Sequence, residues 1–414
     1  MQSSAGEAVV RAQGWQGTTA ATATGHLFLY LVENLEDPFE GLKHSLRTRG
    51  CSEDRLADIR LAARAYSVIR KVEYSGLKYV RTFYYRDIFR ELERNIRTAA
   101  QNMPVGEPIF VYLSDEGVWA EFLKQVLSGI ERPIYSVNVQ HGFFLLERQY
   151  LERPWSVGVR RLVNRVATLA FGYPMLGLAF GRGECDVYLC YGERECNFLL
   201  AEGNRIVYAT PRLIKYNLLT RFRKALATSS MPRDRLTALI AMPACVPGTE
   251  FKCDLQQFLE AVAPAVDYLV DELGWDVIVR FHPGRNVDEC ARILDKTALC
   301  DRVEIDRERD VVVSMARCDA VLAAHSTVLF EAGLLGKVPV ALRTECFRRP
   351  LHYRHEVVDL GRDFRAELAT ALGDDVRARY KSQGEGLELD WGRELDKILL
   401  ELEANSQPGV RNAR

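Results

Sequence analysis

The feature that most constrains the fold is a run of short apolar segments alternating with amphipathic ones in the second half of the chain. The segments "LTALIAMP", "WDVIVRFHP", "DAVLAAH" and "VPVAL" are typical of strands, and those between them, such as "DLQQFLEAVAPAVDYLVDELG", have the periodicity of helices. Strands that are apolar throughout are buried on both faces, as in a parallel sheet covered by helices on each side. The second half therefore predicts a doubly wound, Rossmann-like domain.

The first half predicts a second α/β domain. "PIFVYLSDEG", "VWAEFLKQVLSGI" and "PIYSVNVQHG" form a strand–helix–strand unit of the parallel type, and "HLFLYLVEN", "CDVYLCYGE" and "RIVYAT" add further strands. Between them, Gly41 to Gln101 has a mostly helical pattern, so we expect a helical insertion in this domain. The whole chain is expected to be α/β, with two Rossmann-like domains facing across a cleft.

Composition sets the expected boundaries. The first 20 residues are rich in Ser, Thr, Ala and Gly and are expected to be disordered, and Leu226–Asp234 has the composition of a linker. The expected segments are a disordered terminus over 1–20, an N-terminal acceptor-side domain over 21–225, a C-terminal nucleotide-sugar domain over 235–360, helices over 361–402 and a flexible tail over 403–414.

Charge and cysteine usage exclude several classes of protein. The chain has 55 basic and 56 acidic residues, so it has no overall charge that would attract nucleic acid. No charged and apolar leader is present at the N-terminus, which favours a cytoplasmic location. The ten cysteines include no Cys-x-x-Cys pair, and the trio Cys185, Cys190 and Cys196 lacks the spacing of a zinc finger. Buried, reduced thiols are therefore expected.

One segment raises the question of a membrane. Val166–Phe180 is apolar but has only 15 residues, whereas a spanning helix needs about 20. The preferred interpretation is a buried helix–turn–helix. Because Arg160, Arg161 and Arg165 precede the segment and Arg182 follows it, a peripheral contact of residues 160–182 with anionic headgroups on the inner face of the membrane is the alternative.

The stretch "RFHPGR" is the first candidate site. In an open parallel sheet, ligands bind beyond the carboxyl ends of the strands, and His282 follows such a strand directly. Pro283 and Gly284 fix the turn that presents the imidazole, and Arg280 and Arg285 add permanent positive charge. This combination suits a phosphate ligand, or a general acid for a departing phosphate oxygen. The alternative is a histidine that only caps a turn.

The second candidate is "AAHSTVLFEAGLLG". His325, Ser326 and Thr327 stand where a strand gives way to a helix, and hydroxyl groups together with unpaired backbone N–H groups form an anion site there. Glu331, one turn further along, is placed to accept hydrogen bonds from a ribose diol. We expect this site on a strand neighbouring that of His282. The alternative is a plain helix N-cap.

The third candidate lies in the first domain. Asp115 and Glu116 follow the strand of "VYLSDEG", where a carboxylate can take a proton from an attacking hydroxyl. His141 follows the next strand in "NVQHG" and is a rival base. Acidic residues at a helix start also interact favourably with the helix dipole, which is the structural alternative.

In order and in context, "SDEG", "RFHPG" and "AHSTVLFEAGLLGKVPV" resemble the motifs of GT-B glycosyltransferases, in particular the bacterial sialyltransferases and capsule Kdo transferases that use CMP-activated sugars. The pattern is also similar to that of CDP-glycerol-type polymer transferases. The resemblance covers roughly residues 105–145 and 236–345. The capsule Kdo transferases carry Glu-Asp-Gly where this chain has Gln140-His141-Gly142, so the chain departs from that pattern.

The resemblance implies a reaction. A sugar would pass from a CMP-sialic acid or CMP-Kdo donor to a hydroxyl group of a surface glycan such as lipopolysaccharide or capsule. Asp115 would be the base, His282 would bind and protonate the phosphate, and Ser326 and Thr327 would hold that phosphate. The nucleotide sugar is then a substrate, no further cofactor is implied, and the lack of an Asp-x-Asp motif predicts catalysis without a metal.

Two alternatives stay open. A nucleotide-sugar epimerase of the same fold also has a His-Pro loop, but its "DSGGxQEE"-like stretch is absent where this chain has "AHSTVLFEA". A non-catalytic nucleotide-binding subunit of an envelope-polysaccharide complex is the other. The chain has neither a Gly-x-Ser-x-Gly elbow nor a P-loop, which disfavours serine hydrolases and P-loop enzymes.

Overall fold

The chain forms two compact units, which divide between Tyr216 and Asn217. The division falls after the first residue of helix α8 (Tyr216–Thr228), so all of this helix except Tyr216 belongs to the second unit. The computed structural model describes residues 24–31, 36–48, 50–73, 81–105, 107–113, 117–140, 154–177, 181, 185–204, 207–209, 216–228, 234–243, 253–282, 285–324, 326–346 and 356–385.

Unit 1, the part before Asn217, contains one parallel sheet with the strand order β2-β1-β3-β4-β5-β6. Its strands are β1 (Gly25–Tyr30), β2 (Leu56–Arg60), β3 (Ile109–Leu113), β4 (Ile134–Val139), β5 (Val187–Cys190) and β6 (Val207–Ala209). Its helices are α1 (Glu36–Thr48), η1 (Glu53–Arg55), α2 (Ala63–Glu73), α3 (Arg81–Asn102), α4 (Gly117–Ser128), α5 (Pro154–Phe171) and α6 (Glu193–Ala201).

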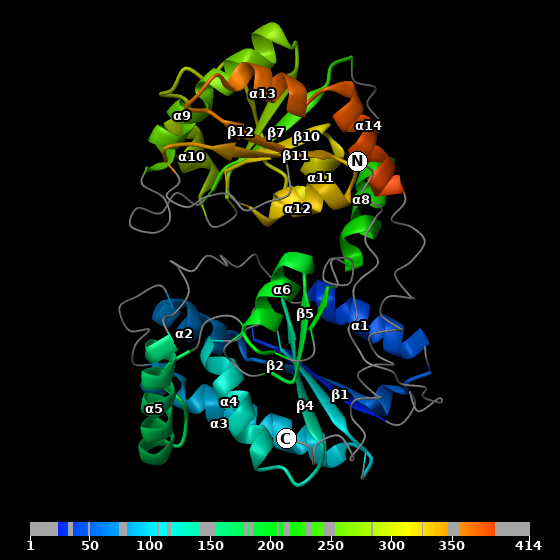
Figure 1. Ribbon diagram of the computed structural model, residues 1–414, viewed down its shortest axis with the longest axis vertical. Helices are drawn as coiled ribbons and strands as arrows, with labels where there is room; N and C mark the ends of the chain where they lie inside the picture. Colours follow the sequence, from blue (N-terminus) through cyan, green and yellow to red (C-terminus); the bar gives the residue numbers. More distant parts are fainter. Residues whose placement is uncertain are drawn as a thin grey trace. The chain divides into compact units, whose positions relative to one another are not determined.

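The two faces of this sheet have different cores. Because side chains alternate along a strand, Leu27 and Leu29 of β1 face α2, α3 and α4, while Phe28 and Tyr30 face α1. Figure 1 shows these helices on opposite sides of the unit 1 sheet. The α1 face is aromatic: Phe28 stacks on Tyr112 with ring centroids 4.8 Å apart. Both faces are thus covered, as the apolar strands predicted.

Strand β2 was not predicted within the mostly helical region Gly41–Gln101. Leu56–Arg60 lies within the region expected to be helical, but it pairs in parallel with β1 at the edge of the sheet. Only Ile59 is buried in this strand, and Asp58 and Arg60 alternate with the apolar positions. An edge strand with one buried residue lacks the continuous apolar run by which the central strands were recognised.

Unit 2, Asn217–Leu389, has the strand order β12-β11-β10-β7-β8-β9, and every pair is parallel. Its strands are β7 (Thr237–Ala241), β8 (Asp276–Arg280), β9 (Glu304–Ile305), β10 (Ala320–Ala323), β11 (Val338–Arg343) and β12 (Glu356–Asp359). Its helices are α8 (Tyr216–Thr228), α9 (Leu255–Asp267), η3 (Tyr268–Glu272), α10 (Val287–Leu294), α11 (Val311–Ala316), α12 (Thr327–Leu334), α13 (Phe364–Ala371) and α14 (Asp374–Glu385).

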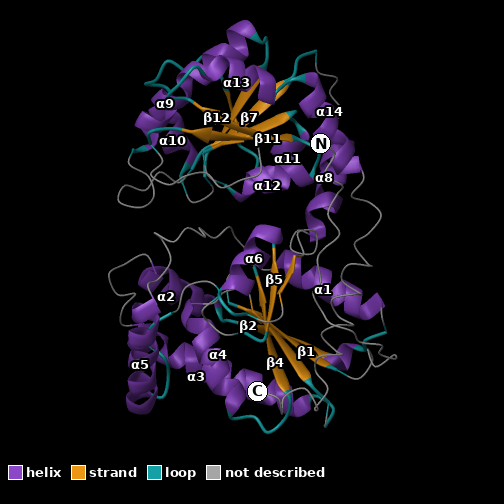
Figure 2. Cartoon of the chain, in the orientation of Figure 1, coloured by secondary structure: helices purple, strands orange, loops and turns teal. Residues whose placement is uncertain are grey.

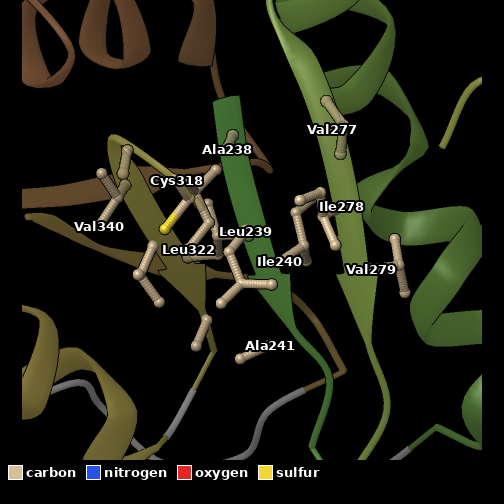
Figure 3. Packing of buried hydrophobic residues seen from close by; sticks show 14 of the residues in the cluster. Ala238, Leu239, Ile240, Ala241, Val277, Ile278, Val279, Cys318, Leu322 and Val340 are labelled. Carbon is tan, nitrogen blue, oxygen red and sulfur yellow. The ribbon is translucent and has the colours of Figure 1, made fainter. Parts of the chain in front are cut away.

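In sequence terms this order is 3-2-1-4-5-6 reversed, the arrangement of a Rossmann domain. Helices α11 and α12 cover one face of the sheet and α9 and α13 the other, and Figure 2 shows the strands enclosed between helices. Residues of the central strands, among them Leu239, Ile278 and Leu322, form the buried core seen in Figure 3. The doubly wound fold predicted from the second half is confirmed.

Side chains at the helix starts fix where several unit 2 helices begin. Asp254 caps α9 in a capping box: its carboxylate accepts from the N–H of Gln257 at 2.9 Å, and the Gln257 side chain accepts from the N–H of Asp254. Asn286 caps α10, and Asp310 caps α11. Each cap directly follows a strand or the loop after it, so the helices begin near the carboxyl edge of the sheet.

Candidate nucleotide edge of unit 2

The order of the strands reverses between β7 and β10 in unit 2. From β7 the chain adds β8 and β9 on one side, and it then returns to add β10, β11 and β12 on the other. The loops after strands on either side of such a switch point diverge, which leaves room for a ligand beyond the carboxyl ends. The carboxyl end of β10 lies next to this switch point, and the Ser-Thr pair follows that strand.

Ser326 is the N-cap of α12. Its Oγ accepts a hydrogen bond from the backbone N–H of Val328 at 3.2 Å, and Thr327 is the first helical residue. The local alternative, an N-cap, is therefore what the Ser326 oxygen does in this structure. The Ser326 hydroxyl proton and the Thr327 hydroxyl, both on half-buried residues, can still donate to an anion. His325 lies outside the described residues.

His282 is exposed at the end of β8. Its carbonyl oxygen accepts from the backbone N–H of Arg285 at 2.9 Å, and Pro283 and Gly284 lie outside the described part of the chain. Desolvation by the neighbouring protein atoms lowers the pKa of the His282 imidazole, and the positive charge of Arg285 lowers it further. The imidazole is therefore mostly neutral at pH 7 unless an anion binds beside it.

The two motifs are not on neighbouring strands, which corrects one expectation. β7 lies between β8 and β10, so the strand that ends at His282 and the strand that leads to Ser326 are about 10 Å apart. The sequence could not show this, because the strand that follows β9 crosses back over the sheet. A ligand that touched both motifs would extend across the end of β7.

Arg280 is held inside unit 2. Its Nη1 lies 2.6 Å from the carboxylate of Asp306 and 2.8 Å from the carbonyl oxygen of Glu308, and it also donates to Ser314. The side chain of Asp306 is 0% exposed and that of Arg280 is 11% exposed. The sequence suggested a cation for a ligand, but the structure places this guanidinium in a buried network that joins β8 to the segment after β9.

The remaining predicted residues are spread over this edge. Arg285 is exposed beside His282, at the start of α10. Glu331 is buried in the second turn of α12, on the helix whose N-terminus follows β10. Thr344, which sequence reasoning missed, follows β11; it is buried, and its hydroxyl has no hydrogen-bond partner among the described residues. A lone threonine after a strand gives no signal in the sequence.

A disulfide braces the same edge and corrects the expectation that all thiols are reduced. Cys253, just before α9, is bonded to Cys346, just after β11, with Cα atoms 5.0 Å apart. Because β10 lies between β7 and β11, the bond joins the segments that follow the strands on either side of β10. The partners are 93 residues apart in sequence, so their spacing gave no indication of the pairing.

In unit 1, the predicted bases follow β3 and β4, which are adjacent strands, but Asp115, Glu116 and His141 lie outside the described residues. Helix α4 begins at Gly117, whose φ is +33°. A Cβ at Gly177 would lie 2.8 Å from the backbone of Gly117, so the segment 174–177 packs directly on the start of α4. Asn164 holds this segment through the N–H groups of Met175 and Leu176.

Three buried polar residues lie at the carboxyl ends of β4 and β5. Asn138 is 2% exposed, and its Nδ2 has no hydrogen-bond partner among the described residues. The side-chain oxygen of Gln140 accepts from the N–H of Tyr191 at 2.9 Å and so ties the two strand ends together. Burial raises the pKa of the Glu195 carboxyl in the first turn of α6. Asn138 and Glu195 were missed by sequence reasoning, although an amide inside an apolar strand was a visible signal.

The described residues bear on the metal and membrane questions that the sequence raised. No group of three or more His, Cys, Asp or Glu side chains there is placed to hold a metal ion. No helix within the described ranges is both long and apolar enough to cross a bilayer. Helix α5 ends at Phe171, and residues 174–177 are not helical, so the described part of Val166–Phe180 does not form the expected helix–turn–helix.

No protein-family model matches the sequence, and no curated protein does. Solved structures do resemble it. The S. aureus MnaA–UDP co-structure aligns over 93% of this chain and 98% of its own, with 16% identity and a TM-score of 0.52. The UDP-N-acetylglucosamine 2-epimerase from Rickettsia bellii aligns over 94% and 99%, with 10% identity and a TM-score of 0.51.

A third structure, the glycotransferase of kitacinnamycin, aligns over 92% of this chain and 98% of its own, with 12% identity and a TM-score of 0.50. At these identities the likeness concerns the fold. Together with the two parallel six-stranded sheets, it shows that the chain has a GT-B-like, two-domain α/β fold.

Proposed function

We propose that this chain is a glycosyltransferase that moves a sugar from a nucleotide-activated donor to a hydroxyl group of a surface-glycan acceptor. The observation that carries the proposal is the carboxyl edge of unit 2. There the N-terminus of α12, with Ser326 and Thr327, follows β10 beside the switch point, and His282 with Arg285 follows β8. Within a GT-B-like fold, this is an edge suited to the phosphate of a nucleotide.

On the donor side, each residue has a separate task. The hydroxyl groups of Ser326 and Thr327 and the first N–H groups of α12 would hold the phosphate. Glu331 would accept hydrogen bonds from the ribose. Since the pKa of His282 is lowered in the free protein, its ring takes up a proton most readily when a phosphate anion lies beside it. His282 would then donate to the leaving phosphate oxygen, with Arg285 nearby, while Arg280 positions the end of β8. His325, which precedes Ser326 in the sequence, is a further candidate contact for the phosphate.

On the acceptor side, a base must take the proton of the attacking hydroxyl as the bond between the anomeric carbon and the phosphate oxygen breaks. Asp115 is the base that the resemblance favours, with Glu116 beside it, and His141 is the rival at the end of the adjacent strand. The resemblance favours CMP-sialic acid or CMP-Kdo as the donor. Catalysis without a metal is part of the same proposal.

A nucleotide-sugar epimerase is the second candidate, because two of the similar folds belong to MnaA in complex with UDP and to a UDP-N-acetylglucosamine 2-epimerase. The residues at the start of α12 argue for the transferase, since this chain has "AHSTVLFEA" where the epimerases have an acidic, glycine-containing stretch. A binding subunit without turnover remains the third outcome.

The test is turnover on a panel of donors. The full chain would be incubated with CMP-sialic acid, CMP-Kdo, CDP-glycerol and UDP-N-acetylglucosamine, with and without a glycan acceptor, and followed by NMR. Acceptor-dependent release of free nucleotide, unchanged by EDTA, is the expected result. Inversion of configuration at one carbon of the sugar, without release of the nucleotide, would establish the epimerase instead. Binding without either reaction would leave only a nucleotide-binding protein.

We also propose that helix α5 contacts an anionic membrane surface. Val159, Leu162, Val166 and Leu169 recur at helical spacing on one side of α5 and are exposed, Leu162 by 61% and Leu169 by 89%. The helix contains three arginines and no acidic residue, and Arg165 is exposed within this stripe. An apolar stripe flanked by cations complements a bilayer with anionic headgroups.

Vesicle sedimentation tests this contact. The full chain should bind vesicles that contain phosphatidylglycerol more tightly than pure phosphatidylcholine vesicles, and Leu162→Glu with Leu169→Glu should abolish binding. Arg165→Gln should weaken binding about fivefold, since one cation near the surface contributes about 1 kcal/mol. Leu226→Glu, at an exposed apolar position of α8, is the matched control. Equal binding by the stripe variant and the control would refute the contact.

A further inference from the structure

We propose that Cys190 and Cys196 are a site of reversible disulfide formation at the start of α6. Cys190 is the last residue of β5, and Cys196 lies in the first turns of the helix that follows. Their Sγ atoms are 3.1 Å apart, although no disulfide joins them in this structure. The inference rests on this geometry and does not depend on the reaction proposed above.

Little movement separates the thiol pair from a disulfide. A disulfide has its sulfur atoms about 2.05 Å apart, so the two sulfurs must approach by roughly 1 Å. Cys190 is fixed in the sheet, where its strand pairs with both β4 and β6. The first turn of α6 is less constrained, because its N-cap is Gly192, which provides no side-chain cap. Closure therefore requires a shift of this turn toward β5.

The two thiols differ in exposure, and this sets the order of the chemistry. Cys196 is half-buried, whereas Cys190 is buried and its sulfur contacts the carbonyl oxygen of Tyr208 at 3.2 Å. The hydrogen bond with Cys196 and the burial of the site raise the pKa of the Cys190 thiol well above its usual value. Cys196 is thus the thiol that meets an oxidant from solution, and Cys190 is the one that resolves the intermediate.

The oxidant we name is a small disulfide, such as oxidised glutathione. The Cys196 thiolate attacks one of its sulfurs, and the first glutathione leaves as a thiol. Cys190 then attacks the Cys196 sulfur of the mixed disulfide and releases the second glutathione. The protein loses two electrons and two protons, which end on the two glutathione thiols, and a thiol reductant reverses the process.

The location gives the modification a structural consequence. Tyr191, next to Cys190, donates its backbone N–H to Gln140, so the segment that would move is bonded to the end of β4. Glu195, with its buried carboxyl, lies next to Cys196 in the same turn. A shift of this turn would therefore displace groups at the carboxyl edge of the unit 1 sheet. Cys185 packs against the same small cluster and is the competing partner.

Peptide mapping of the full chain tests the proposal. After treatment with oxidised glutathione and alkylation of the remaining thiols, trypsin yields residues 183–194, with Cys185 and Cys190, and residues 195–205, with Cys196. We expect the two peptides to be joined, with fragmentation placing the bond at Cys190. The link should be lost in Cys196→Ser and Cys190→Ser and kept in Cys185→Ser, and a thiol reductant should remove it.

Cys300, an exposed thiol, serves as the internal control because it should gain a single glutathione without a cross-link. The proposal is wrong if Cys300 is modified while Cys196 stays alkylated or keeps its glutathione, or if the link runs to Cys185. Hydrogen exchange of the wild-type chain provides a second measurement that needs no variant. Amides of α6 should exchange at different rates in the oxidised and reduced protein, and identical exchange would contradict the predicted shift of this turn.

Discussion

Replacing Arg280 by alanine separates two roles that a cation at a strand end can have. If the residue served mainly to bind a ligand, its loss would weaken nucleotide binding and leave stability intact. In the structure its guanidinium instead donates to Asp306, Ser314 and the carbonyl oxygen of Glu308, and it is 11% exposed. We therefore expect the main effect on the free energy of unfolding.

The magnitude follows from what the substitution leaves behind. Asp306, 0% exposed at its side chain, would lose its cation. Removing one partner of a buried ion pair costs about 3–5 kcal/mol. The lower end applies here, because the hydroxyl of Ser314 and the N–H of Glu308 still donate to this carboxylate. A loss of about 3 kcal/mol lowers the Tm of a domain of this size by about 6–12 °C.

Scanning calorimetry of the full chain measures this, since the two units can melt in separate transitions. The matched control is Arg285→Ala, an exposed arginine five residues away, for which we expect a change within about 0.5 kcal/mol and weaker nucleotide binding. If Arg280→Ala left every transition in place and abolished nucleotide binding, Arg280 would belong to the ligand site and our assignment would be wrong.

Three further predictions concern a disulfide, a buried carboxyl and a titrating histidine. Cys253→Ser opens a cross-link between residues 93 positions apart, which should lower the free energy of unfolding in urea by about 4 kcal/mol without reductant. Dithiothreitol should lower the free energy of unfolding of the wild type to that of the variant. Equal stability of the two proteins without reductant would contradict this prediction. Burial raises the pKa of Glu195 above 4.5, so the folded protein disfavours the charged carboxylate. The free energy of unfolding therefore falls as the pH rises above that value. Glu195→Gln should therefore be more stable than wild type at pH 7.5 and equal to it at pH 3.5, and a less stable variant at pH 7.5 would refute the argument. The pKa of His282 is lowered from 6.5, and a bound phosphate favours its protonated form, so nucleotide affinity should rise between pH 7.5 and 5.5 more steeply in wild type than in His282→Gln. Equal slopes in calorimetric titrations would show that the ring does not contact the phosphate.

The central strands of both sheets could be predicted because their residues are buried on two faces. β7 and β10 are buried at every position, and strands buried on both faces have such continuous apolar runs. The edge strands β2 and β12 were missed, since each has one buried residue and its polar positions resemble a loop. Local pattern thus identified the sheet wherever burial was complete.

The candidate site was predicted only as far as single strand ends. The sequence identified the turn at His282 and the helix start at Ser326, but not the strand that separates them. It also could not show that Arg280 pairs with Asp306, or that Cys253 meets Cys346, because these contacts join segments brought together by crossovers of the chain. Such contacts depend on strand order, which no local pattern encodes.

Titration calorimetry with CMP, CDP, UDP, GDP and ADP tests the central claim most directly, on the wild type, His282→Ala and Ser326→Ala. We predict that one nucleotide, CMP by the resemblance, binds the wild type, and that each substitution weakens it at least tenfold while Leu226→Ala, on the exposed side of α8, does not. Preference for another base would keep the phosphate site and change the donor. If no nucleotide bound, or if both variants bound as tightly as wild type, the carboxyl edge of unit 2 would not be a nucleotide site.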